Sequence, residues 1–227
     1  MLDRKPSLRL NECKARIAAS GWYAYQSGLS GIEALAAEVA SLASGLGDIV
    51  LGRNRNRVEH IVPLEAASSY AGSLSSRFGL EALPLHTDMA HWPIPCRYLV
   101  IACAEPGPSP TPTILLDSQA VQITESEAAA RMSAVFLIRN GRRSFYGSIM
   151  ERDRHFVRFD LGCMEAISAD CTAAKAPFSL YRNAERILRQ EWTRGEVLVF
   201  DNWRMLHGRG VAGQTARGRV LLRATVR

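Results

Sequence analysis

The chain has 227 residues, of which 47% are hydrophobic and 22% are charged, and its formal net charge is +6. This composition is typical of one soluble globular domain and excludes a collagen-like fibre, a coiled coil and a disordered chain. Apolar runs such as residues 134–138 and 197–200 are far too short to cross a bilayer. The basic N-terminus, broken by Pro6, lacks the apolar segment of a secretory signal. We therefore expect a single cytoplasmic domain over residues 1–227, with no membrane partner.

Arginine dominates the basic residues, and the arginines occur in short groups rather than in one long run. Because guanidinium matches carboxylate, phosphate and sulfonate groups in a bidentate way, a small anionic ligand explains these groups as well as nucleic acid does. The five cysteines form no CxxC pair and are odd in number. This usage favours reduced thiols and argues against a disulfide framework.

Residues 1–47 are expected to form a helical flank. Residues 8–20 fit a first helix. Ser30 followed by Glu33 has the spacing of a capping box, and the apolar residues after it recur at helical intervals up to Leu42. Gly45 and Gly47 then end this second helix.

From Asp48 onward the pattern changes to short strands separated by Gly, Pro and Ser. Helices are expected from Thr124, again with an acidic residue at Glu127, and over residues 178–190. Many short strands with a few helices predict a β-sandwich or barrel over residues 48–227. The expected strands cover residues 48–51, 57–62, 83–90, 97–104, 113–116, 134–139, 144–149, 155–159, 196–201, 205–208 and 219–226.

A His-x-Asp pattern at His86 and Asp88 is the first sign of chemistry. Residues two apart on a strand point to the same face, so the imidazole and the carboxylate converge there. They supply two of the three ligands of the two-histidine, one-carboxylate set that holds Fe(II). His207 lies 121 residues beyond His86 and follows a strand and a tight turn, so it is the candidate for the third ligand.

The last expected strand carries Arg219 and Arg223, which lie four residues apart and therefore share a face. Guanidinium groups among the apolar residues of this strand are costly unless an anion pairs with them. A dicarboxylate beside the metal would supply that anion.

His86-Thr87-Asp88, the segment from Phe200 to Arg209 and the closing stretch from Arg219 to Thr225 occur in this order. Together they resemble the Fe(II)/2-oxoglutarate dioxygenases of the taurine dioxygenase and clavaminate synthase-like superfamily. The stretch 201–209 is most similar to the gamma-butyrobetaine hydroxylase branch. The resemblance implies a mainly β fold with flanking helices and a double-stranded β-helix (jelly-roll, cupin-like) core.

The resemblance also implies roles for individual residues. His86, Asp88 and His207 would bind Fe(II), and Arg219 would pair with the distal carboxylate of 2-oxoglutarate. Thr113, 27 residues after His86, would donate a hydrogen bond to the same carboxylate. Thr111 is the alternative, because residues 109–112 replace the glycine pair that many members have before this threonine. Arg223 would touch the anionic group of the substrate.

The implied reaction is hydroxylation or desaturation of an unactivated C–H bond, with 2-oxoglutarate as cosubstrate and dioxygen as oxidant. Because Asp88 occupies the position that a halide would need, halogenation is disfavoured. The arginine content favours a small anionic or zwitterionic substrate, such as an amino acid derivative. Arg158 shares an expected strand face with Asp160 and is a further candidate for the substrate pocket.

Two other functions stay open at this point. The high pI and the basic residues 53–57 are compatible with a dioxygenase that acts on nucleic acid or on protein side chains. The absence of aromatic residues within that run argues against a nucleic-acid partner. A non-catalytic ligand-binding sensor on the same barrel is the third possibility. The sequence leaves the oligomeric state undetermined.

Overall fold

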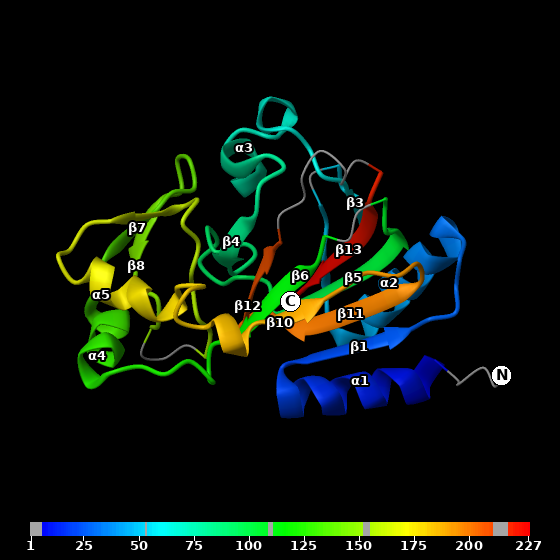
Figure 1. Cartoon of the computed structure of the whole chain (residues 1–227), viewed down its shortest axis with the longest axis horizontal. Coiled ribbons are helices and arrows are strands. Elements are labelled where there is room, and N and C mark those ends of the chain that lie inside the picture. The colour runs from blue at the N-terminus through cyan, green and yellow to red at the C-terminus, as the bar shows by residue number, and fades with distance from the viewer. Residues whose placement is uncertain (1–5, 53, 109–110, 152–154, 211–217) are drawn as a thin grey trace.

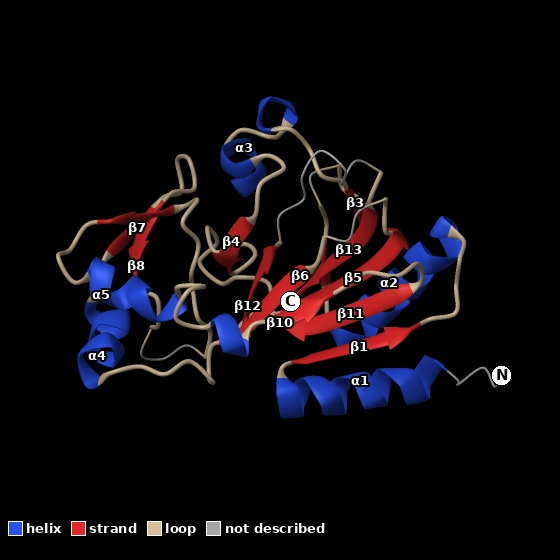
Figure 2. Ribbon diagram, viewed as in Figure 1, coloured by secondary structure: helices blue, strands red, loops and turns tan. Residues whose placement is uncertain are grey.

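The computed structural model describes residues 6–52, 54–108, 111–151, 155–210 and 218–227. Two antiparallel sheets form the centre of the molecule (Figures 1 and 2). The larger sheet has the order β1 (Trp22–Gln26), β11 (Glu196–Asp201), β5 (Tyr98–Glu105), β13 (Val220–Val226), β2 (Ile49–Val50), with β3 (Glu59–Ile61) also paired to β13. The smaller sheet has the order β10 (Leu188–Gln190), β6 (Thr113–Asp117), β12 (Met205–Arg209), β4 (Leu83–His86).

The strands of the larger sheet are covered on both faces, which explains their continuous apolar sequences. In β5, Leu99, Ile101 and Cys103 pack with residues of the smaller sheet between the two sheets. The alternate residues Val100 and Ala102 pack under the N-terminal helices on the outer face. These helices are α1 (Pro6–Ser20) and α2 (Ile32–Leu46).

A separate lobe covers the outer face of the smaller sheet and lies at the left of Figure 1. It contains a three-stranded sheet and two helices, and its apolar cluster includes Leu116 and Leu206 from the smaller sheet. The lobe is built from α4 (Glu125–Ser133), β7 (Phe136–Ile138), β8 (Phe145–Gly147), β9 (Met164–Ala166) and α5 (Cys171–Lys175). Helix α3 (Leu74–Phe78) precedes β4, and short 3-10 turns cover Ala66–Ser68, Ala176–Phe178 and Ala184–Arg186.

This architecture confirms the predicted mainly β fold with flanking helices and a jelly-roll core. The capping box at Thr124 and Glu127 is present, with both reciprocal hydrogen bonds. The one predicted at Ser30 is wrong, because Gly31 is the N-cap of α2 and makes no side-chain cap bond. Within the described parts of the chain, no helix is long and apolar enough to span a bilayer.

Several segments differ from the sequence-based expectation. Residues 178–190 do not form a helix; they form a 3-10 turn and the strand β10, which pairs with β6. Residues 155–159 form only an isolated bridge at Val157. The N-terminal flank is not wholly helical, because β1 pairs in register with β11 at the edge of the larger sheet.

Candidate metal and anion site

Three side chains converge at one end of the smaller sheet. His86 is the last residue of β4, and its Cα pairs in register with that of His207 on the neighbouring strand β12. Nε2 of His86 and Nε2 of His207 lie 3.5 Å and 3.9 Å from Oδ1 of Asp88. One ligand atom from each of the three residues lies within 4.8 Å of the others. The structure therefore brings the predicted triad together.

The backbone after His86 departs from the expected strand. β4 ends at His86, and Met89 has a left-handed φ of 58°, which is uncommon for a residue with a side chain. The buried amide of Asn202 holds this turn: its Oδ1 accepts from the Asp88 N–H at 2.9 Å and its Nδ2 donates to the Asp88 carbonyl at 3.1 Å. The carboxylate thus reaches the histidines from a clamped turn and not from a continuing strand.

The electrostatics of the triad suit a divalent cation. Burial alone would raise the pKa of Asp88, but the positive charge of Arg223 and the hydrogen bond from His86 outweigh burial and lower it well below its usual range. Burial and the adjacent His86 lower the pKa of His207 to about 3. The site therefore combines an ionised carboxylate with a neutral imidazole, which are the protonation states that metal ligands need.

His86 is oriented by its own strand. Its Nδ1 lies 2.9 Å from the carbonyl oxygen of Pro84, so an Nδ1–H donating there would leave Nε2 of the neutral ring as the atom that binds a metal. Burial lowers the pKa of His86, but the hydrogen bond to Asp88 and the Asp88 charge outweigh it and raise the net value.

Arg223 lies directly against this triad. It donates from Nη1 to Oδ2 of Asp88 at 2.8 Å and from Nη2 to Oε2 of Glu59 at 3.0 Å. The guanidinium binds Oδ2 of Asp88, and Oδ1 is the oxygen that faces the histidines.

Arg219 is buried, and it has no carboxylate partner among the described residues. Its Nη1 donates to the carbonyl oxygen of Thr111 at 2.6 Å. Burial and the adjacent guanidinium of Arg209 lower the pKa of Arg219 to about 10. Two buried guanidinium groups without a counter-ion in the described parts are costly, so the site fits an anion such as a carboxylate.

Arg209 was not singled out from the sequence. It lies two residues after His207 on β12, and this spacing was the signal that could have placed it beside the site. Its Nη2 donates to the carbonyl oxygens of Gly79, just after α3, and Glu81.

Thr113 and Thr111 both lie near the buried arginines. Thr113 opens β6 opposite Arg209, and its hydroxyl oxygen accepts a hydrogen bond from Nε1 of Trp192 at 3.1 Å. The hydroxyl hydrogen of Thr113 is therefore left to donate to an acceptor. The buried hydroxyl of Thr111 has no hydrogen-bond partner within the described part of the chain, although its carbonyl binds Arg219.

Arg158 is not placed to meet a substrate. Its side chain is 0% exposed, and its guanidinium donates to the carbonyl oxygens of Ala90, Trp92 (2.6 Å) and Pro93 (3.0 Å). It also lies over the rings of Phe145 and Phe156. The structure therefore corrects the expectation of a substrate contact: Arg158 holds the loop that follows Asp88.

We expect Arg158→Met to lower the free energy of unfolding by about 1–3 kcal/mol, because the buried carbonyl of Ala90 loses its donor and such a loss costs about that much. In a chain of this size the melting temperature should fall by roughly 2–12 °C. Thermal unfolding followed by circular dichroism measures the change, with the exposed Arg189→Met as control. A drop no larger than that of the control would remove the loop-holding role.

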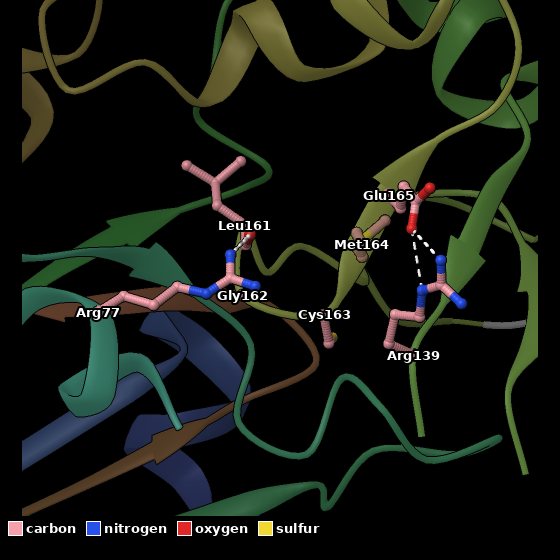
Figure 3. Close-up of a pocket in the computed structure, with 7 residues that line it drawn as sticks. All are labelled: Arg77, Arg139, Leu161, Gly162, Cys163, Met164 and Glu165. Atoms are coloured by element: carbon pink, nitrogen blue, oxygen red, sulfur yellow. Dashed lines mark hydrogen bonds and ion pairs between the residues drawn. The ribbon is translucent and has the colours of Figure 1, made fainter. Parts of the chain in front are cut away.

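A pocket between α3 and the lobe has no part in this triad. Its lining, drawn in Figure 3, consists of Arg77, Arg139 and residues 161–165. Arg77 donates to the Leu161 carbonyl oxygen at 3.1 Å, and Arg139 pairs with Glu165. The charged groups of this pocket are already committed to partners, so it is a poor candidate for the reaction site.

The fold and the donor set define a class: jelly-roll proteins in which two histidines and one carboxylate converge beside a buried arginine. The family model "Taurine catabolism dioxygenase TauD, TfdA family" matches residues 124–225. This range includes His207, Arg219 and Arg223. No curated protein matches the chain in sequence.

Solved structures agree with this assignment at the level of the fold. Asparagine oxygenase in complex with Fe(II), 2S,3S-3-hydroxyasparagine and succinate has a TM-score of 0.76 and 18% identity, over 97% of this chain and 79% of that chain. The non-heme iron oxygenase OrfP in complex with Fe and alpha-ketoglutaric acid has a TM-score of 0.73 and 17% identity, over 98% and 81%. Residues 124–225 are thus similar to the TauD/TfdA family, and the whole chain shares the fold of these two oxygenases, in agreement with the resemblance.

Proposed function

We propose that this chain is an Fe(II)- and 2-oxoglutarate-dependent oxygenase of one domain that hydroxylates a small amino acid or amino acid derivative. His86, Asp88 and His207 would hold the iron. The observation that carries the proposal is the convergence of two imidazoles and one ionised carboxylate beside a buried guanidinium without a carboxylate partner among the described residues.

The residues near Arg219 fit the cosubstrate. Arg219 would bind the distal carboxylate of 2-oxoglutarate through charge-assisted hydrogen bonds, and the free hydrogen of the Thr113 hydroxyl would donate to the same group. Arg209 adds a second positive charge, which lowers the cost of burying a dianion there. The neighbouring OrfP structure was obtained with Fe and alpha-ketoglutaric acid, which supports this assignment.

Each part of the site has a defined task. Bound iron, together with 2-oxoglutarate and dioxygen, supplies the oxidising power for breaking a C–H bond. Asn202 and Arg158 fix the loop that carries Asp88, so the carboxylate stays oriented when ligands come and go. Arg223 lies on the partly open side of the triad, where it would bind the anionic end of a substrate.

The substrate class rests on the neighbours and on charge. One neighbour is an asparagine oxygenase with a hydroxyasparagine product, and OrfP was solved with (3S)-hydroxy-L-Arg. Both bound molecules are hydroxylated amino acids, and their carboxylates suit the buried and partly buried arginines of this site. We therefore propose a small-molecule amino acid substrate.

A succinate-release screen tests the proposal. The protein is incubated with Fe(II), ascorbate and 2-oxoglutarate, and amino acids, betaines, sulfonates and nucleotides are added in turn. We expect succinate and a hydroxylated product with a free amino acid. If iron and 2-oxoglutarate bind but no candidate yields succinate above background, the result favours the alternative of a non-catalytic ligand-binding sensor.

We expect Thr113→Val to raise the KM for 2-oxoglutarate by about 5- to 10-fold, because a single hydrogen bond to a carboxylate is lost, at about 1–1.4 kcal/mol. Steady-state kinetics at saturating substrate measure the change. Thr111→Val tests the alternative residue under the same conditions. A larger rise for Thr111→Val than for Thr113→Val would reassign the contact.

A further inference from the structure

Glu59 is the residue of the site that neither the sequence motifs nor the comparisons point to. It lies on β3, and its Cα is the register partner of Arg223 on β13. Its Oε2 accepts a hydrogen bond from Nη2 of Arg223 at 3.0 Å, while Nη1 of the same guanidinium binds Asp88 at 2.8 Å. One guanidinium therefore separates the Glu59 carboxylate from a candidate metal ligand.

The Glu59–Arg223 pair is partly exposed to solvent, unlike the two other arginines of the site. The Glu59 and Arg223 side chains are 26% and 28% exposed, whereas Arg209 and Arg219 are almost fully enclosed. Among the described residues, Arg223 is the only hydrogen-bonding or ionic partner of the Glu59 carboxylate. An ion pair with this exposure adds little to stability, so its place beside the triad calls for another reason.

The backbone next to Glu59 is shaped around its carboxylate. A Cβ added at Gly52 would lie 2.4 Å from the carboxyl carbon of Glu59. The absence of a side chain at Gly52 thus leaves the space that the carboxylate occupies. Any larger residue at this position would displace Glu59 from its place beside Arg223.

We propose that Glu59 is a specificity-determining residue that binds the ammonium group of the substrate while Arg223 binds its carboxylate. This inference rests on the proposed function and narrows the substrate class to zwitterions with a primary ammonium group, that is, free amino acids. Substrate binding would replace the Glu59–Arg223 ion pair by two new ion pairs. The substrate carboxylate would bind Arg223, and the substrate ammonium would bind the Glu59 carboxylate.

The charge balance of the site explains the selectivity. A ligand with only an anionic end would meet the Glu59 carboxylate beside Arg223, and like charges disfavour its binding. A betaine carries a quaternary ammonium that cannot donate a hydrogen bond, and an N-acetyl amino acid has no positive charge. Both would leave the Glu59 carboxylate without the charge-assisted hydrogen bond that a free amino acid offers.

Binding measured without turnover tests this inference. The protein is loaded with Mn(II) and 2-oxoglutarate under anaerobic conditions, and calorimetry gives the Kd for L-asparagine, L-arginine and the other common L-amino acids. The amino acid that binds most tightly is then compared with its N-acetyl derivative. Glu59→Gln keeps the size of the side chain and removes its charge, Gly52→Ala displaces the carboxylate, and Glu33→Gln on the exposed side of α2 is the matched control.

We expect Glu59→Gln and Gly52→Ala to weaken binding of the amino acid by about 10- to 100-fold, as for the loss of a hydrogen bond to a charged group. N-acetylation should weaken wild-type binding to a similar degree and should cause little further loss in Glu59→Gln. The Kd for 2-oxoglutarate and the Glu33→Gln variant should stay within about twofold of wild type.

The outcomes separate this inference from the proposed function. If Mn(II) and 2-oxoglutarate do not bind to wild type, the proposed function fails. If they bind, but no free amino acid does, or Glu59→Gln binds it as tightly as wild type, the role of Glu59 is overturned and the oxygenase assignment stands. Equal affinity for the amino acid and its N-acetyl derivative has the same consequence.

Discussion

Asp88→Ala is expected to abolish substrate hydroxylation and to weaken Fe(II) binding by more than about 100-fold. Losing a residue that only hydrogen-bonds a metal ligand lowers metal affinity by up to about 100-fold. Asp88 is proposed to bind the metal directly, so its loss should cost more. It is the only carboxylate in the cluster that the described residues form, so the variant leaves two imidazoles without an anionic ligand. Fe(II) binding by equilibrium dialysis and product formation by mass spectrometry measure the two effects.

The exposed Asp48→Asn serves as the control for Asp88→Ala, because it removes a carboxylate on the surface. Circular dichroism establishes that both variants are folded. Hydroxylation that persists in Asp88→Ala would remove Asp88 from the metal site, and the donor set would then need a different third member.

Arg219→Met is expected to raise the KM for 2-oxoglutarate by about 100-fold, since truncating one partner of a buried charge pair costs about 2–5 kcal/mol. The melting temperature of the protein without ligands should stay unchanged or rise. In that state Arg219 is a buried cation next to Arg209, and replacing such a charge by an apolar side chain of similar size is often neutral or stabilising.

The opposite directions of these two effects make the Arg219 test specific. A residue with a purely structural role would lose stability and affinity together. Arg194→Met, which removes an exposed arginine paired with Glu105, is the control and should alter neither quantity by much. An unchanged KM in Arg219→Met would assign the anion-binding role to another residue.

The sequence indicated which residues of the candidate site lie together better than it indicated their surroundings. His86, Asp88 and His207 were singled out because metal ligands need particular residue types at particular spacings, and the structure brings the three side chains together. Arg158 was misread, since its side chain reaches backbone carbonyls that are 65 or more residues away in the chain. No local pattern carries that information.

The same contrast holds for the fold. The strands buried on both faces, such as β5 and β11, were predicted at nearly their observed bounds because their apolar runs are long. The segment 178–190 has helical spacing, but β10 within it pairs with β6, and this tertiary pairing overrides the local preference. Glu59 escaped notice because its role depends on a cross-strand partner 164 residues away.

The position of β13 has a consequence for how the molecule assembles. This strand, contributed by residues 220–226, lies inside the larger sheet between β5 and the short strands β2 and β3. During synthesis, β5 therefore exposes an unpaired apolar edge until more than a hundred later residues have been made. Such non-local pairing slows folding and leaves the nascent chain prone to self-association, so we expect productive expression to depend on chaperones and low temperature.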